Sequence, residues 1–234
     1  MPYKAAIKAI VLTLGLFLSL SSWGAWNEIS EDAQEALKLK PDMYNGMQIF
    51  RTCTKCHYKS GWGQHNGDIP QIAGQHPKVL IKQLTDVRDY KRETSGMDHF
   101  IMLSMIDSAQ ALADVAAYTA DILMTPEPGI GPGTDLEHGK TLFATYCVPC
   151  HGENGEGSNE KFFPRIQGQH YKYLLRQFDW IYRRERLNAH PGMMGAITNF
   201  SNRDSEAVID YISRLKPPKE NVAPSTDWEN PDFD

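Results

Sequence analysis

Apolar side chains recur at helical spacing in several segments of the chain, so that they would line one face of an α-helix. The strongest such pattern runs from Pro77 to about Tyr90. Two more follow a serine suited to capping a helix, one from Ser108 to Tyr118 and one from Ser201 to Leu215. These patterns predict a helical protein.

Shorter helices are expected nearer the N-terminus. The segment from Trp26 to Asp42 is polar and favours a helix, with Ala33 and Ala36 on one face. Tyr44 to Phe50 predicts a short helix that leads into a cysteine motif. The last segment, 217–234, is rich in proline and acidic residues and predicts a tail that is either disordered or wrapped over the surface.

The chain repeats itself at an offset of 94 residues, which is the separation of Cys53 and Cys147. The offset holds without a gap over about forty residues, and it pairs glycines, prolines, glutamines and histidines as well as cysteines. A linker rich in glycine and proline, 125–133, separates the copies. We therefore predict two tandem domains, 26–124 and 134–216, followed by the acidic tail.

The N-terminus has the features of an export signal. Lys4 and Lys8 precede an apolar run of about a dozen residues, and small residues follow up to Ala25. The run is short for a helix that must cross about 30 Å of hydrocarbon, so a retained anchor is the weaker alternative. We expect 1–25 to be a cleaved signal peptide and the mature protein to be periplasmic.

Composition narrows the class of protein. The chain has 234 residues, a formal charge of −5 and 10% aromatic residues, which is not the composition of a disordered chain. The net acidic charge argues against a nucleic-acid partner. Four cysteines are present, and all of them lie in two short motifs.

Those motifs are Cys53–His57 and Cys147–His151, each with the pattern Cys-x-x-Cys-His. This is the attachment signature of a c-type haem, in which two thiols add across the vinyl groups and the histidine reaches the iron from the same side. We predict two covalently attached haems c. The predicted attachment residues are Cys53, Cys56, Cys147 and Cys150, and the predicted proximal iron ligands are His57 and His151.

Two other readings of the cysteines are weaker. Four sulfurs could form one tetrahedral zinc site, but that leaves the histidine after each pair unexplained. A thioredoxin-like dithiol would require a strand-rich context, which the pattern does not predict.

With these motifs the chain resembles the two-haem periplasmic cytochromes c of the cytochrome c4 kind. The resemblance also rests on Pro70–Gln75 with its counterpart Pro164–Gln169, on Ala113–Tyr118, and on Met193-Met194 ahead of Phe200-Ser201. It implies an all-α fold of two tandem class I cytochrome c domains, each a small helical bundle around one haem.

The sixth iron ligand is expected from a methionine-rich segment in each half. In the second half Met193 and Met194 follow a turn at Pro191-Gly192, although a methionine pair could also simply fill the core. By resemblance, the family's spacing ahead of the last helix selects Met193. The first half departs from this spacing, so Met97 is favoured there with His99 and Met102 as alternatives. A histidine ligand would lower that haem's potential relative to a methionine.

Basic residues lie just before each ligand segment: Lys91, Arg92, Arg183, Arg184 and Arg186. They could be a solvated helix end, or they could pair with haem propionates, for which a guanidinium is well suited. His76 and His170 also repeat, and we expect them to be surface or structural residues rather than iron ligands.

The expected function is that of a single-electron carrier. The resemblance implies a quinol-oxidising complex or periplasmic dehydrogenase as donor and a terminal oxidase or reductase as acceptor, with peripheral membrane association possible. The alternatives are a dihaem enzyme, such as a sulfur-compound dehydrogenase or peroxidase, or the electron-transfer subunit of one. Such enzymes need an open or cysteine-ligated iron, and the motifs leave no cysteine free.

Overall fold

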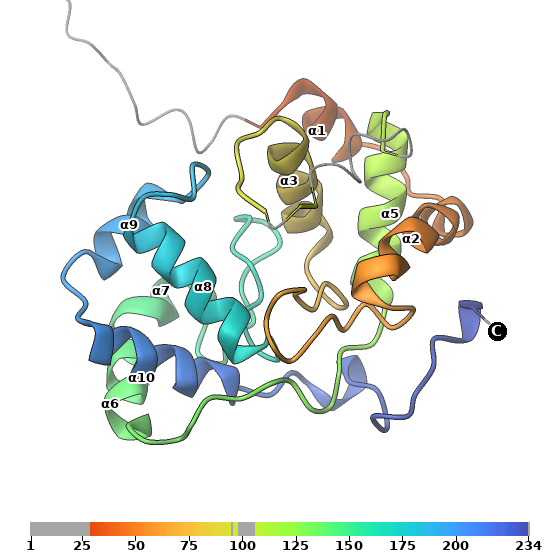
Figure 1. Cartoon of the computed structure of the whole chain (residues 1–234). Coiled ribbons are helices and arrows are strands. Elements are labelled where there is room, and N and C mark those ends of the chain that lie inside the picture. Colours follow the sequence, from red (N-terminus) through yellow and green to blue (C-terminus); the bar gives the residue numbers. More distant parts are fainter. Residues whose placement is uncertain (1–28, 95, 98–105, 234) are drawn as a thin grey trace, which may run out of the picture.

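The computed structural model describes residues 29–94, 96–97 and 106–233. The predicted signal peptide lies outside these residues. Helices in two groups, side by side, make up the described chain (Figure 1), and its β-structure is limited to two isolated bridges. The predicted all-α class is therefore confirmed. Within this part of the chain, none of the helices combines the length and apolar character needed to cross a bilayer.

The first group of helices surrounds a core that includes Phe50, Leu112 and Val115. Helix α2 crosses α5 closely, because a Cβ atom at Gly46 would collide with the backbone carbonyl of Asp114. The helices of this group are α1 (Glu31–Ala36), α2 (Met43–His57), α3 (Pro77–Arg88) and α5 (Ala109–Asp121).

The second group repeats this plan around a core that includes Phe143, Ile197 and Val208. Here α10 crosses α6 at Gly139, against the backbone carbonyl of Ala207. The elements are α6 (Leu136–Leu142), η1 (Phe143–Cys147), α7 (Val148–His151), α8 (Tyr171–Tyr182), α9 (Pro191–Ile197) and α10 (Asn202–Ser213).

The second half is one residue longer than the first between its crossing glycine and its cysteine motif, and a π-helical turn, η1, lies in this stretch. The crossing glycines, Gly46 and Gly139, are 93 residues apart, whereas Cys53 and Cys147 are 94 apart. A π-helix accommodates one extra residue within a continuous helix, and η1 lies between the crossing glycine and the end of the cysteine motif. The second half thus absorbs its extra residue without moving the motif off the helix.

Helix ends follow the predicted signals at several places. The Ser108 hydroxyl accepts a hydrogen bond from the Ala111 amide at the start of α5, and Ser201 and Asp204 form a capping box on α10. The expected N-terminal helix is shorter than predicted and spans only Glu31–Ala36. Pro191 does not form a turn but begins α9, because the fixed backbone of proline suits the first helical position.

The predicted linker 125–133 is irregular but closely packed. The Thr125 amide donates to the side chain of Gln71 in the first half. The Gly133 amide donates to the carboxylate of Asp210 in the second half. The linker is therefore bonded to both groups of helices.

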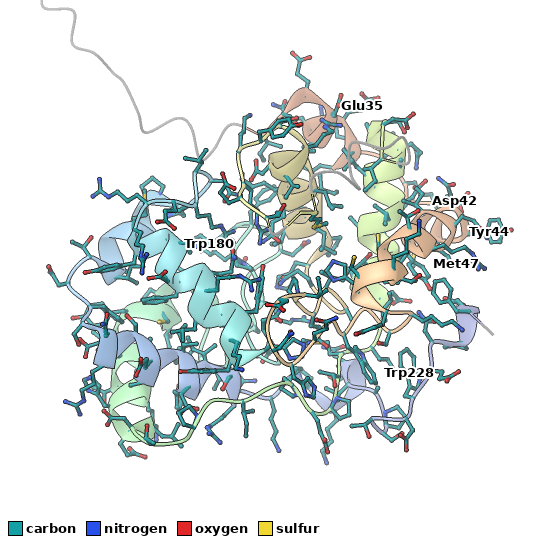
Figure 2. The ribbon with its side chains drawn as sticks, in the orientation of Figure 1. Glu35, Asp42, Tyr44, Met47, Trp180 and Trp228 are labelled. Carbon is teal, nitrogen blue, oxygen red and sulfur yellow. The ribbon has the colours of Figure 1, made fainter. Side chains whose placement is uncertain are left out.

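The acidic tail wraps over the first half, which decides between the two predicted alternatives (Figures 1 and 2). Val222 pairs with Met124 in an isolated parallel bridge. Trp228 stacks on Trp62 with ring centroids 5.8 Å apart, and Phe233 packs 6.0 Å from Phe50. We call residues 222–233 the C-terminal strap.

Candidate haem sites

Each Cys-x-x-Cys-His motif lies at the end of a helix in the structure. Cys53, Cys56 and His57 occupy the last turns of α2, and Cys147 to His151 covers the end of η1 and all of α7. Residues three and four positions apart share one face of a helix. Both thiols and the imidazole can therefore address one group on that face.

The two motif histidines are held in the same way. His57 Nδ1 lies 2.9 Å from the Pro70 carbonyl oxygen, and His151 Nδ1 lies 3.0 Å from that of Pro164. A carbonyl oxygen only accepts, so Nδ1 carries the proton and Nε2 keeps its lone pair. This second hydrogen bond is the arrangement that orients a metal-ligating histidine.

Burial keeps both imidazoles neutral. Only 5% of His57 is exposed, and burial lowers the pKa of His57 and of His151 below the usual range, although each proline carbonyl acts in the opposite direction. A neutral imidazole with a free Nε2 is the form that binds iron.

The cysteines adjoin the apolar cores. None of the four forms a disulfide. Cys147 belongs to the second core and Cys53 packs against the first, and burial raises the pKa of each of these two thiols to about 12. Thiols facing apolar side chains suit attachment of a porphyrin, which is itself largely apolar.

A shared zinc site is not formed. In the described part of the chain, which includes all four cysteines, no three His, Cys, Asp or Glu side chains are grouped so that they could hold a metal ion. Tetrahedral zinc would need the sulfurs to converge. The residues present fit one haem in each half instead.

Comparison with known proteins agrees with this geometry. The cytochrome c family model matches residues 43–121 and 136–216, once in each half. Cytochrome c4 of Azotobacter vinelandii is 31% identical over 190 residues, which cover 74% of this chain and 89% of that protein. The chain belongs to the cytochrome c4 family. It is a dihaem c-type electron carrier, with haem c covalently bound at each cysteine pair.

A solved structure and a second relative extend the comparison. The crystal structure of reduced cytochrome c4 from Pseudomonas stutzeri superimposes with a TM-score of 0.66 at 27% identity, covering 75% of this chain and all of that one. A thiosulfate dehydrogenase electron acceptor of Stutzerimonas stutzeri is 26% identical over 174 residues, covering 70% of this chain and 78% of that protein. Redox proteins are therefore the partners of this cytochrome c4 homologue.

The predicted sixth ligands are placed only in part. Met193 and Met194 both lie on α9, half-buried against the second core. Met97 is half-buried against the first core, whereas His99 and Met102 lie outside the described residues. The choice among these candidates stays a prediction.

Two of the repeated arginines lie between the halves rather than in solvent. Arg92 donates to the hydroxyl of Tyr173 across the interface at 2.8 Å, and its buried Nε has no partner. Arg186 donates to Asn188 and Gln177. Burial, with the like charge of Arg92 second, lowers the pKa of Arg186 to about 9.

In the described part of the chain, neither Arg92 nor Arg186 forms an ion pair. The charge of Asp86 acts on Arg186, but Asp86 already pairs with Lys82. Lys91, Arg183 and Arg184 are exposed, which agrees with the alternative that these basic residues form a solvated helix end. The unpaired charge of Arg92 and Arg186 fits the propionates of a haem.

Gln75 and Gln169, for which the sequence predicts no role, contact the backbone of the opposite half. They join the halves together with His76 and His170. His76 Nε2 donates to the carbonyl of Glu156 at 2.8 Å, and His170 Nε2 donates to that of Trp62 at 2.7 Å. Glu156 and Trp62 are themselves related by the 94-residue offset. The signal was the recurrence of Gly-Gln-His after each haem motif, but a repeat does not say that each copy contacts the other.

Proposed function

We propose that this cytochrome is exported to the periplasm and carries single electrons between respiratory redox proteins, with both irons six-coordinate. The observation that carries the proposal is the matched arrangement of His57, which is buried, and His151, which is half-buried; each is neutral and oriented by a proline carbonyl. Haem c supplies a one-electron Fe(III)/Fe(II) couple. Two equivalent sites in one chain suit a carrier of electrons.

In this proposal His57 and His151 are the proximal ligands and Met193 is the distal ligand of the second half. Met97 is the distal ligand of the first half, with His99 and Met102 as the alternatives. A methionine from α9 and the apolar side chains around it would close the iron to water and small molecules. A closed iron favours electron transfer over ligand chemistry.

Arg92 and Arg186 are proposed to bind haem propionates. A buried cation near an iron makes the oxidised, more positive state less favourable, so these arginines would raise the reduction potentials. Arg92 already bridges to Tyr173 of the other half, which would bring one half's arginine close to the haem of the other.

Location and partners rest on the sequence. Residues 1–25 are proposed as the signal peptide, and residues 26–124 and 134–216 as the two domains. A quinol-oxidising complex or a periplasmic dehydrogenase is the proposed donor, and a terminal oxidase or reductase is the proposed acceptor. Peripheral association with the membrane would bring the carrier to such complexes.

One relative favours a second function. The similarity to a thiosulfate dehydrogenase electron acceptor supports a role as the electron acceptor of a sulfur-compound dehydrogenase, as a subunit or a diffusing partner. Co-purification with a catalytic subunit, and reduction by that enzyme and its substrate, would favour this role. Turnover by the purified cytochrome alone would instead favour an enzyme of the dehydrogenase or peroxidase type.

The test is spectroscopic. Electron paramagnetic resonance and near-infrared spectra of the oxidised protein separate His/Met from His/His ligation haem by haem. Two low-spin haems without carbon monoxide binding in the reduced state support the carrier. A high-spin haem that binds carbon monoxide would overturn six-coordination at that site.

A further inference from the structure

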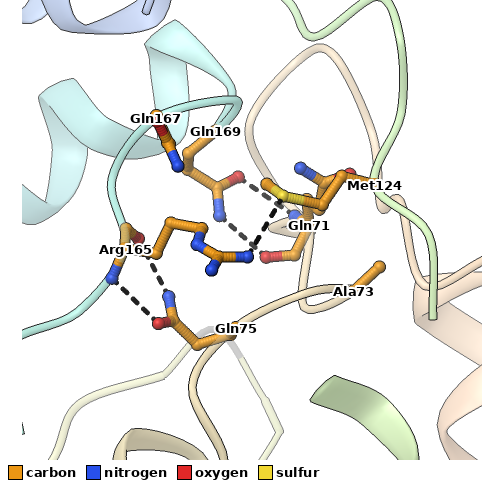
Figure 3. Close-up of a pocket in the computed structure, with 7 residues that line it drawn as sticks. All are labelled: Gln71, Ala73, Gln75, Met124, Arg165, Gln167 and Gln169. Carbon is orange, nitrogen blue, oxygen red and sulfur yellow. Dashed lines mark hydrogen bonds between the residues drawn. The ribbon is translucent and has the colours of Figure 1, made fainter. Parts of the chain in front are cut away.

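The side chain of Gln169 reaches across the interface and binds the backbone of Gln71 at both ends. The Gln71 amide donates to Gln169 Oε1 at 3.0 Å, and Gln169 Nε2 donates to the Gln71 carbonyl at 2.7 Å. Figure 3 shows these bonds at the junction of the two halves. Both residues are buried, with 4% of Gln71 and 8% of Gln169 exposed.

The same pair of bonds occurs a second time with the halves exchanged (Figure 3). The Arg165 amide donates to Gln75 Oε1 at 2.9 Å, and Gln75 Nε2 donates to the Arg165 carbonyl at 2.9 Å. Residues 71 and 165, like 75 and 169, are related by the 94-residue offset. Each half therefore binds the backbone of the other through the side chain of one glutamine.

The backbone bound by Gln169 also accepts a hydrogen bond from the motif histidine of the first half. The peptide group between Pro70 and Gln71 accepts from His57 Nδ1 at its oxygen and donates to Gln169 at its nitrogen. One peptide unit thus joins the imidazole of the first half to a glutamine of the second.

The second half has the reciprocal connection. The peptide group between Pro164 and Arg165 accepts from His151 Nδ1 and donates to Gln75. We call these two chains of hydrogen bonds the crossed relays. In each relay the histidine and the glutamine belong to opposite halves.

We propose that Gln169 and Gln75 are positioning residues that set the reduction potential of the haem in the opposite half through these crossed relays. The inference rests on the proposed role of His57 and His151 as proximal ligands. Neither glutamine touches the cofactor site in this proposal, since each acts through one peptide group.

The physical reason is polarisation along a chain of hydrogen bonds. A peptide whose N–H donates to a side-chain oxygen becomes a better acceptor at its carbonyl. A stronger bond from histidine Nδ1–H to that carbonyl raises the basicity of the imidazole as a metal ligand. A more basic ligand stabilises Fe(III), so an intact relay lowers the potential of the opposite haem.

The two relays differ in surroundings. Gln169 is buried whereas Gln75 is half-buried, and hydrogen bonds are electrostatically stronger where water is excluded. Loss of Gln169 is therefore expected to have the larger effect, and the haem at Cys53 and Cys56 is expected to be the one that shifts more.

The experiment compares Gln169→Leu and Gln75→Leu in the haem-loaded protein, with the potential of each haem followed by its own resonances in an NMR redox titration. Gln169→Leu should raise the reduction potential of the haem at Cys53 and Cys56. The expected shift is at most about 59 mV, which is a tenfold change in the one-electron redox equilibrium. The other haem should change little. Gln75→Leu should produce the converse pattern.

Two further variants separate tuning from loosening of the interface. Asn159→Ala removes a neutral cross-interface bond to the Lys78 amide that is not part of either relay, and it should leave both potentials unchanged. Gln169→Glu keeps an oxygen at the Gln71 amide, so the first haem should stay at or below its wild-type potential.

The outcomes discriminate clearly. Equal shifts of both haems, a shift confined to the half that carries the substitution, or no shift in either variant would overturn the crossed relays. A parallel weakening of the His57 Nδ1–H hydrogen bond, seen as a change in its proton chemical shift in Gln169→Leu only, would support them. A wild-type protein without two low-spin haems would instead refute the proposed function, and it is detected before any variant is compared.

Discussion

At the scale of single residues, the two adjacent methionines of α9 differ in their proposed roles. Met193 and Met194 are both half-buried against the second core, so burial does not separate them. The proposed ligand is Met193. Iron ligation is a stricter requirement than packing, because only one sulfur can occupy the sixth position.

Met193→Ala should therefore open the iron of the second half. We expect one haem per chain to become high-spin when reduced and to bind carbon monoxide, while the first haem is unchanged. Absorption and carbon monoxide difference spectra measure this directly.

Met194→Ala is the matched control, and it should leave both haems low-spin. Loss of core packing there should lower stability by about 2–5 kcal/mol at most. If Met194→Ala rather than Met193→Ala opens the haem, the ligand assignment is wrong.

Arg186 is expected to raise the potentials through its charge. Arg186→Gln removes a half-buried cation next to Arg92, so the oxidised state should become more favourable and at least one potential should fall. The expected change is up to about 59 mV, a tenfold change in a one-electron equilibrium. A redox titration followed optically is sufficient.

Arg183→Gln controls for net charge. Its side chain is 61% exposed and pairs with Asp179, and an exposed charge is screened by solvent and salt. Equal effects of the two substitutions would contradict a propionate partner for Arg186.

At the scale of elements, the C-terminal strap is part of the first half although it follows the second in sequence. Asn230 is 4% exposed and donates to the Lys59 carbonyl and the Tyr118 hydroxyl. Asp232 accepts from that hydroxyl at 2.8 Å. The strap thereby ties the end of the chain to α5 and to the residues after the first haem motif.

Asn230→Ala should destabilise the protein by about 1–3 kcal/mol, because it removes a buried side chain that bonds the Tyr118 hydroxyl, the Lys59 carbonyl and the Asp232 amide. Thermal unfolding followed by circular dichroism would show a lower Tm. Glu229→Ala, at the neighbouring exposed position, should be nearly neutral. Identical Tm values for the two variants would show that the strap adds nothing to stability.

His170, the residue before α8, can form its hydrogen bonds between the halves only when its imidazole is neutral. Its Nδ1 accepts from the Gly129 amide and its Nε2 donates to Trp62, so a second proton would break the first bond. Burial is the main cause that lowers the pKa of His170. The unfolded chain therefore binds that proton more readily, and stability should fall as pH drops below about 6.5.

His170→Gln should reduce this slope of stability against pH and should lower stability at neutral pH. Denaturant unfolding at several pH values between about 5 and 8 measures both effects. His65→Gln removes only the smaller contribution that the neighbouring His65 makes to the lowered pKa of His170, so it should leave most of the slope in place. An unchanged slope in His170→Gln would remove His170 as a source of acid sensitivity.

At the scale of the whole molecule, the sequence predicted the local structure and the haem attachment better than the contacts between halves. Helical periodicity and caps identified α3, α5 and α10, and the two Cys-x-x-Cys-His motifs identified the cofactor. These signals are local, because spacing along one helix determines them. The predicted domain bounds, 26–124 and 134–216, stay predictions.

The contacts between halves depend on how two surfaces meet. The repeat included Gln75 and Gln169, but only the structure shows that each binds the backbone of the other copy. The strap gave no periodic signal, because the spacing of Trp228, Asn230 and Phe233 follows the shape of the surface on which they pack and not the repeat of a helix or strand. The π-helical turn of η1 gave no signal either, because the 94-residue offset begins at the cysteines and the extra residue lies before them.

Both halves are expected to act as equivalent one-electron sites within one chain. The most direct measurement is an anaerobic spectroelectrochemical titration of the intact protein, matured in a host that attaches haem c. We predict uptake of two electrons per chain in two one-electron steps, with low-spin spectra throughout and no carbon monoxide binding. Uptake of a single electron, or a high-spin haem that binds carbon monoxide, would contradict a carrier built from two closed haem sites.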